Sequence, residues 1–414
     1  MENMRQDSAI RQFCAARVEE QELDHSLDHI RSSLDLTNDN DAPQLELDQL
    51  VDAFFNDNNN DDSMADDVHY ESNAPCANLE KGVDEGLQLI WPCLNPSGDS
   101  LQRVSHCFSI ALNSRLSLLQ NLNPNDSLST NNKIHVTKQE KAQAFALLHK
   151  TTPYIVFGFT AANAAICEAA KGKQSLHIVD LGMEHNLQWP SLLKSLSIQP
   201  LLPKSIWITG VIGDLDAAEE VEHSMRRLHD EAGEYGITLE YNFLHKHKHV
   251  KESRGSLKTI LQSIKKLGPN LVTVVEQDAN HNGPFFLGRF LECLHYYAAV
   301  FDSLEWRLAR GSGERMKIER WHLGEEICNV VACEGEDRVE RHERADQWRR
   351  QMGRAGFQVV GFKCLDEVKG VVGRYGSEGY TLAIEKGCLQ LGWKGRPIMM
   401  ASAWQLNNLS SSSS

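Results

Sequence analysis

Residues 175–190, SLHIVDLGMEHNLQWP, decide the fold class. The apolar run Leu176-His177-Ile178-Val179 stops at Asp180, and a glycine and then a helical segment follow. A short β-branched run that ends at a carboxylate and leads into a helix is typical of the first strand of an α/β sheet. In open α/β folds, ligands bind at the carboxyl ends of the strands. The sequence therefore predicts that the sheet begins here, with Asp180 at that edge.

The rest of the chain repeats this pattern. Residues 205–211, 237–244 and 271–275 are predicted strands, separated by predicted helices at 214–233 and 256–267. Strands and helices that alternate at this spacing indicate parallel βαβ units. Residues 380–385 and 389–404, joined at Lys386-Gly387, predict an antiparallel hairpin at the edge of the sheet. We therefore expect an α/β fold with a mostly parallel sheet, a C-terminal antiparallel hairpin and an α-helical cap.

Three regions of different composition divide the chain. Residues 1–75 contain the acidic stretches TNDNDAP and FNDNNNDDSMADD, which are too polar to offset their ordering entropy, so this segment is expected to be mostly disordered. It is either an interaction or activation segment that folds on a partner, or a solvated tail. Residues 76–406 form the expected domain: a mainly helical cap at 76–172 and a core at 173–406 with a helical insertion near 285–310. A disordered Ser-rich tail is expected at 407–414.

The overall composition restricts the class of protein. The chain has 414 residues, 41% of them hydrophobic, and a formal net charge of −15. This acidity argues against binding nucleic acid through the overall field, although a local basic groove is compatible with it. No apolar run approaches 18 residues and no export signal begins the chain, so we expect no membrane partner. The ten cysteines contain no CxxC pair, which indicates reduced thiols in the cytosol or nucleus.

An enzyme is the first functional hypothesis, because a parallel sheet that ends in an antiparallel hairpin is the layout of S-adenosylmethionine-dependent methyltransferases. Such a cofactor needs a glycine-rich turn after the first strand, where backbone amides approach it closely. Here only Gly182 is present, and Met183, Glu184 and His185 follow it. We therefore predict no enzyme activity and no cofactor. The alternative is a methyltransferase-like enzyme or a small-molecule-binding module on the same fold.

Polar residues are expected to gather at the carboxyl ends of the first and fourth predicted strands. They form either a residual pocket from an ancestral cofactor site or a buried network that fixes the strand-to-helix turns. They are Asp180, Glu276, Gln277, Asp278, His281 and Asn282. No metal is predicted, because Asp278 and His281 lack a ligand spacing and the run His245, His247, His249 is more typical of a solvated loop.

A charged cluster and three tryptophans are further candidates for structural or partner-binding roles. Arg338, Arg341 and Glu343 form an alternating-charge cluster, which is either a structural ion-pair lattice or a contact to a partner's acidic surface or phosphate. The large residues Trp189, Trp393 and Trp404 are predicted core anchors.

Several motifs together resemble one family, the GRAS-domain transcriptional regulators of plants. His177, Ile178, Val179 and Asp180 with Gln188, Trp189 and Pro190 resemble its VHIID motif. Residues 275–282, VEQDANHN, are similar to a VEQEANHN element, and residues 338–343, RVERHE, contain Arg338, Glu340 and Arg341 of another block. Residues 391–404, with Trp393 and Trp404, resemble the SAW motif. The resemblance covers residues 79–405.

This resemblance implies a fold, a location and partners. The fold is a Rossmann-like, methyltransferase-related core with a helical cap that contains leucine-rich regions. The protein would be nuclear and would bind other transcription factors or a second GRAS protein, as a homo- or heterodimer, with weak or indirect association with DNA. The first leucine-rich region looks truncated upstream of Leu79, and no DELLA sequence is present.

Overall fold

The computed structural model describes residues 12–19, 94–120, 136–183, 185–201, 203–212, 215–245, 254–376 and 378–407. The side chains of residues 12–19 are not described. The leucine-rich segment that begins at Leu79, the residues His247 and His249, and the tail from residue 408 lie outside these ranges.

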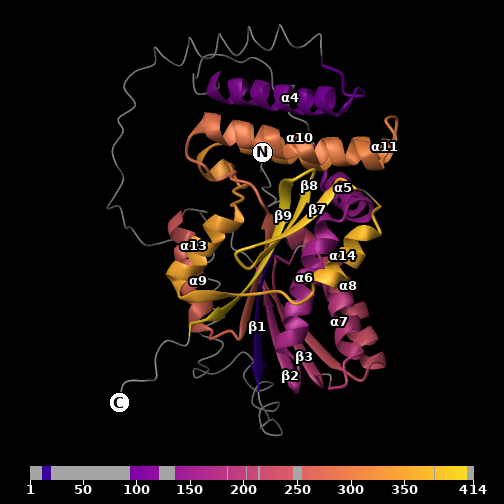
Figure 1. Ribbon diagram of the computed structural model, residues 1–414, viewed down its shortest axis with the longest axis vertical. Helices are drawn as coiled ribbons and strands as arrows, with labels where there is room; N and C mark the ends of the chain where they lie inside the picture. Colours follow the sequence, from indigo (N-terminus) through magenta and orange to yellow (C-terminus); the bar gives the residue numbers. More distant parts are fainter. Residues whose placement is uncertain are drawn as a thin grey trace.

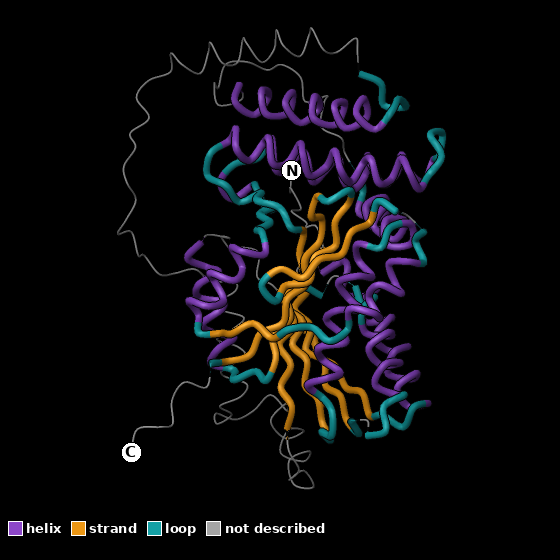
Figure 2. Tube along the Cα trace, viewed as in Figure 1, coloured by secondary structure: helices purple, strands orange, loops and turns teal. Residues whose placement is uncertain are grey.

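The described strands form one nine-stranded sheet (Figures 1 and 2). Its order is β4-β3-β2-β1-β5-β9-β8-β7, and β6 also pairs with β9. The strands are β1 (Gln12–Glu19), β2 (Ser175–Asp180), β3 (Ser205–Ile212), β4 (Thr238–His245), β5 (Leu271–Gln277), β6 (Phe357–Val360), β7 (Tyr380–Glu385), β8 (Cys388–Trp393) and β9 (Arg396–Leu406).

The sheet is mixed, and the prediction of a mostly parallel sheet is wrong. Only β2 with β3 and β3 with β4 pair in parallel among the described strands. Strand β1 lies between β2 and β5 and is antiparallel to both, and β5 pairs antiparallel with β9. Strand β1 comes from the segment that we expected to be mostly disordered. Its sequence QFCAARVE lacks a strand pattern, and only pairing on both sides makes it part of the sheet.

Helices cover both faces of the sheet and one end (Figure 1). Helices α9 and α13 lie together on one side, α6, α7, α8 and α14 lie on the other, and α4 and α10 run side by side across the end as a cap. The helices are α4 (Ser100–Gln120), α5 (Lys138–Thr151), α6 (Tyr154–Ala169), α7 (Trp189–Ser197), α8 (Leu215–Glu234), α9 (Arg254–Lys266), α10 (Phe286–Arg307), α11 (Gly313–Ile318), α12 (Gly324–Ala332), α13 (Ala345–Ala355) and α14 (Leu365–Gly373). No helix in these described ranges is long and apolar enough to cross a membrane.

The start of α4 follows from its sequence. Asp99 Oδ1 accepts a hydrogen bond from Gln102 N at 2.9 Å, and Asp99 N donates to Gln102 Oε1 at 3.1 Å. This reciprocal capping box satisfies two of the amide groups that a helix leaves unpaired at its N-terminus. The capping box therefore accounts for the start of α4 at Ser100.

Two Lys-Gly turns build the C-terminal hairpins. Lys386 and Gly387 have φ values of 50° and 87°, and Lys394 and Gly395 have 48° and 85°. Positive φ at both central residues is the type I′ geometry that joins antiparallel strands through two residues. The first hairpin, β7 to β8, is confirmed. The second, β8 to β9, was missed, because we predicted residues 389–404 as a single strand although Lys394-Gly395 interrupts it.

The sequence did not predict continuous helical structure across residues 313–332. Residues 313–332 form one continuous helical stretch in which α11 passes through the π-helical turn Glu319–Leu323 into α12. The wider turn places Glu319, His322 and Leu323 in the interior. Such turns inside α-helices are frequent at functional sites.

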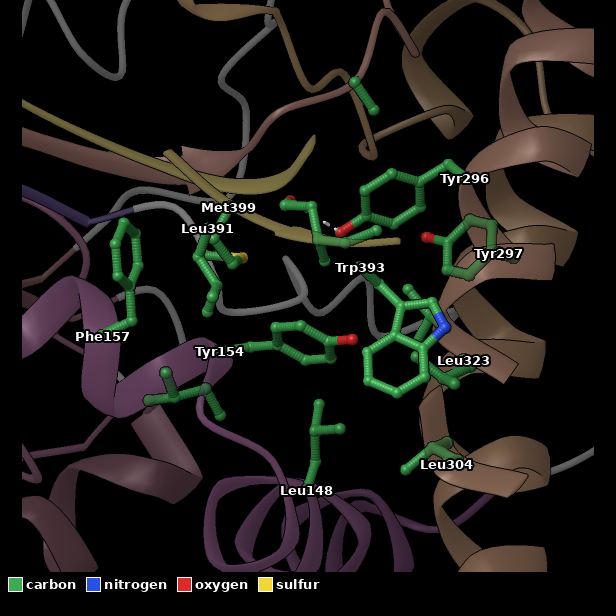
Figure 3. Packing of buried hydrophobic residues seen from close by; sticks show 14 of the residues in the cluster. Leu148, Tyr154, Phe157, Tyr296, Tyr297, Leu304, Leu323, Leu391, Trp393 and Met399 are labelled. Carbon is green, nitrogen blue, oxygen red and sulfur yellow. Dashed lines mark hydrogen bonds between the residues drawn. The ribbon is translucent and has the colours of Figure 1, made fainter. Parts of the chain in front are cut away.

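The main core lies where the cap meets the sheet (Figure 3). Leu148, Tyr154 and Phe157 from α5 and α6 face Leu391, Trp393 and Met399 from the hairpins, with Tyr296, Tyr297 and Leu304 of α10 beyond them. Tyr296 OH donates to Ile398 O at 3.1 Å, so a buried hydroxyl ties α10 to β9. Cap and sheet therefore share one hydrophobic core.

Candidate functional site

The turn after β2 is filled by its own side chains. Asp180 is buried, and its Oδ1 accepts a hydrogen bond from Gly182 N at 3.1 Å. Met183 is fully buried, and its thioether occupies the space that a side chain at Gly210 on β3 would need. His185 stacks on Phe145, with ring centroids 4.8 Å apart. The residues where a methyltransferase places its cofactor therefore pack against the rest of the protein.

The VHIID-like residues hold β2 and α7 in place. Ile178 and Val179 are buried in the clusters on opposite faces of the sheet, and His177 Nε2 lies 3.0 Å from Thr209 Oγ1 on β3. Trp189 is buried among the leucines of α7, and Pro190 lies in the first turn of this helix.

Gln188 fastens α7 to α6. Its Nε2 donates to Asn163 Oδ1 at 2.8 Å, and Asn163 Nδ2 donates back to Gln188 O at 3.3 Å. This part of the motif orients two helices in the structure.

Two buried carboxylates hold the start of α13. Glu276 Oε2 accepts from Glu343 N at 3.0 Å and from Trp348 Nε1 at 2.5 Å. Asp278 Oδ1 accepts from Ala345 N at 3.1 Å, and its Oδ2 accepts from Gln390 Nε2 at 2.5 Å. Both carboxylates therefore accept hydrogen bonds from backbone amides at the N-terminus of α13, where negative charge is favourable.

His281 and Asn282 bind the segment that precedes α13. His281 N donates to His342 O at 2.9 Å, and Arg338 Nη1 donates to His281 O at 3.0 Å. Asn282 Nδ2 donates to Glu343 Oε1 at 2.8 Å. The VEQDANHN and RVERHE segments, which are about 60 residues apart in the chain, thus form one hydrogen-bonded unit.

The buried rings of His281 and His342 have opposite pKa shifts. Their Nδ1 atoms are 2.9 Å apart, and His342 Nε2 lies 3.2 Å from Glu340 Oε2. Burial opposes charge on His342, but the hydrogen bond and the charge of Glu340 raise its pKa. Burial, with the nearby His342, places the pKa of His281 well below its ordinary value. These opposite shifts favour a positive charge on His342 rather than on His281.

The arginines of the RVERHE segment bind mainly backbone. Arg341 Nε donates to Arg338 O at 2.8 Å, its Nη2 donates to Gly335 O at 2.7 Å and its Nη1 donates to Asn282 Oδ1 at 3.2 Å. Burial and the neighbouring Arg341 lower the pKa of Arg338 to about 10. Glu340 N donates to Asn329 Oδ1 on α12 at 2.8 Å.

Glu326 on α12 connects this network to the cap. Its Oε2 accepts from Tyr297 OH at 2.9 Å, and its Oε1 accepts from Gln277 Nε2 at 3.2 Å. His322 Nε2 of the π-helical turn lies 3.5 Å from Oε1. We did not predict Glu326 or His322. Glu326 lies on the same helical stripe as Leu323, Val330 and the core, and an acidic residue on an apolar stripe is the signal that was missed.

The predicted polar residues separate into two places. Glu276, Gln277, Asp278, His281 and Asn282 meet in the network described above. Asp180 lies across β1, two strand spacings or about 10 Å from β5. No three His, Cys, Asp or Glu side chains within the described ranges are arranged to hold a metal ion. The carboxylates of Glu276 and Asp278 are bonded to the protein's own donors.

Two tryptophans of the C-terminal motif anchor the hairpins. Trp393 Nε1 donates to Asp302 Oδ2 at 2.6 Å on α10, and Trp404 Nε1 donates to Ser402 Oγ at 2.9 Å. Both indoles are buried in the hydrophobic clusters.

We expect His185 to make stability depend on pH. Its ring nitrogens are buried although the residue is partly exposed, and burial lowers the pKa of His185 to about 4. Because the unfolded chain binds the proton near pH 6.5, this contribution is complete above that pH and is lost on acidification toward pH 4. Between pH 7 and pH 5 the wild type should lose about 2 kcal/mol more unfolding free energy than His185→Phe. Urea unfolding at both pH values measures this difference, and equal losses would contradict it.

The structure is that of a mixed α/β domain with a helical cap at one end of the sheet. The chain belongs to the GRAS domain family, whose model matches residues 83–254 and 242–405. The family resemblance inferred from the motifs is therefore confirmed.

Individual relatives agree with this assignment. The chain is 40% identical to the GRAS family protein RAD1 of Lotus japonicus over 347 residues, 74% of this chain and 67% of that protein. It is 36% identical to the DELLA protein RGL1 of Arabidopsis thaliana over 291 residues, 63% of this chain and 56% of the relative. The chain thus spans between about half and two thirds of the relatives' length. The structure of SCL7 from Oryza sativa superposes with a TM-score of 0.70 at 26% identity, covering 81% of this chain and all of that one.

Proposed function

We propose that this protein is a nuclear, non-enzymatic regulator of plant transcription that acts by binding other transcription factors or a second GRAS protein. Its GRAS relatives are plant transcriptional regulators. The observation that carries the non-enzymatic part is the turn after β2, where Met183 is fully buried against Gly210. A nucleotide cofactor needs glycine backbone at that position.

In this proposal the core is Rossmann-like in the shared direction of strands β2 to β5, and the carboxyl ends of these strands no longer bind a ligand. Because β1 is antiparallel to both β2 and β5, these two strands point the same way, as do β3 and β4. Residues 76–406 act as the GRAS domain, and the acidic N-terminal segment acts as an interaction segment. The motif residues position the partner-binding surfaces from inside the domain, and any association with DNA is weak or indirect.

Calorimetric titration of the full chain with S-adenosylmethionine tests the non-enzymatic part. We expect no saturable heat up to millimolar ligand, because Met183 and His185 occupy the turn. The variant Met183→Gly, which restores a second glycine, controls for a site that is only blocked. Micromolar binding by the wild-type chain would overturn the proposal and favour the methyltransferase-like alternative.

A further inference from the structure

A basic face on α9 and α13 contrasts with the acidity of the whole chain. The two helices lie side by side on one face of the sheet (Figure 1), and both contribute to the same buried cluster through Ile264 and Trp348. Their outer surfaces carry six cationic residues, of which five are exposed and Arg349 is partly buried. This basic face consists of Lys258, Lys265, Lys266, Arg349, Arg350 and Arg354.

These cations are largely without acidic neighbours. Only Arg350 forms an ion pair, with Asp346 at 2.6 Å, and no carboxylate in the described part of the chain lies within 4.0 Å of the other five. The helix termini account for part of the set, because Lys265, Lys266 and Arg354 lie in last turns, where cations interact well with the helix dipole. Lys265 Nζ lies against Gly356, which ends α13, 2.9 Å from where a Cβ would be. Lys258, Arg349 and Arg350 lie outside the last turns and need another explanation.

The net negative charge of the chain comes almost entirely from one segment. Residues 32–80, the acidic tract, contain thirteen of the carboxylates and no Lys or Arg, whereas the formal net charge of the whole chain is −15. The rest of the protein is therefore close to neutral. The carboxylates are Asp35, Asp39, Asp41, Glu46, Asp48, Asp52, Asp57, Asp61, Asp62, Asp66, Asp67, Glu71 and Glu80.

We propose that the acidic tract binds the basic face of its own chain. Charge complementarity favours it, and both ends of the tract are tethered: β1 ends at Glu19, and the described chain resumes at residue 94. The tract ends at Glu80, 14 residues before residue 94, so it stays attached to the domain by a short segment. Such a tether gives a local concentration on the order of millimolar, above that of a free partner.

The charges of the tract and of the basic face also determine whether the tract or a nucleic acid occupies this face. Lysines and arginines in this arrangement also suit phosphates. A free tract with thirteen carboxylates would repel a polyanion, and it stays attached to the chain during any encounter. The tract therefore occupies the basic face when no partner is present, and a polyanion has to displace the tract in order to bind.

Zero-length carbodiimide crosslinking of the full chain tests this contact, because it joins carboxylates to lysine amines that touch. We expect amides between Asp57–Asp67 carboxylates and Lys265 or Lys266 in the monomer, about fivefold above the exposed control residues Lys194 and Lys204, and lost in 1 M NaCl, where the Debye length is about 3 Å. The arginine reversal, Arg349→Glu/Arg350→Glu/Arg354→Glu, reverses three charges of the basic face but keeps both reporter lysines. It should lower the crosslinking yield at Lys265 and Lys266 to that of the control lysines.

A second measurement separates the occupants. Neutralising Asp57, Asp61, Asp62, Asp66 and Asp67 to asparagine in the full chain should strengthen binding of a random-sequence DNA duplex by about tenfold at low salt, and the arginine reversal should abolish the gain. Equal crosslinking of the control lysines, crosslinks found only between two copies, or DNA binding that is unchanged by the asparagine variant would each overturn the proposal.

Discussion

Glu276→Leu should destabilise the domain by about 4 kcal/mol, because two buried N–H groups, on Trp348 and Glu343, then lose their acceptor. The carboxylate is fully buried at the end of β5, and no solvent replaces it. Urea unfolding monitored by far-UV circular dichroism measures the loss.

Matched variants separate this effect from the change of side chain. Glu276→Gln keeps an acceptor oxygen and should cost about half as much. Glu385→Leu, on the exposed edge strand β7, should change the stability by less than about 0.5 kcal/mol. In the Glu276→Leu background, Trp348→Phe should cost less than it does in the wild type, since the orphaned N–H is removed. A Glu276→Leu protein within 1 kcal/mol of the wild type would show that this network does not fix α13.

The local elements of the core could be predicted from the sequence, and their pairing could not. Strands β2 to β5 lie within about two residues of their predicted bounds, because β-branched runs and helical periodicity are local signals. The order of strands depends on contacts between distant segments, so the insertion of Gln12–Glu19 between β2 and β5 left no local sign.

For the candidate site, the sequence predicted the residues at the end of β5 but not the residues that they contact. Strand β5 was expected to end before Glu276, because a carboxylate after apolar residues reads as the end of a strand, yet the strand continues to Gln277 with every residue buried. The charge is tolerated there because α13 begins against it. Glu276, Asp278 and His281 were recognised as a group, but their partners in residues 338–348 come from an element that no sequence spacing connects to them.

Arg103→Met should destabilise the protein by about 4 kcal/mol by leaving a buried carboxylate without its main partner. Arg103 is 1% exposed, and its Nε donates to Glu319 Oε1 and Oε2 at 3.1 and 2.9 Å. Its Nη1 donates to Glu305 Oε2 at 2.5 Å, so this one guanidinium links α4 to α10 and to the π-helical turn. Thermal and urea unfolding of the variant measure the cost.

The pH dependence and a second substitution identify the cause. Burial already raises the pKa of Glu319, and Arg103 is the group that opposes this most strongly. A carboxylate whose folded pKa lies above its unfolded value destabilises the fold increasingly as the pH rises, so the deficit of Arg103→Met should be larger at pH 7 than at pH 5. Arg103→Met/Glu319→Gln, which removes the orphaned charge, should recover about 2 kcal/mol at pH 7. If the double variant is as unstable as the single one and the deficit does not change with pH, lost packing between α4 and α10 is the cause, and the π-helical turn is not held in place by this ion pair.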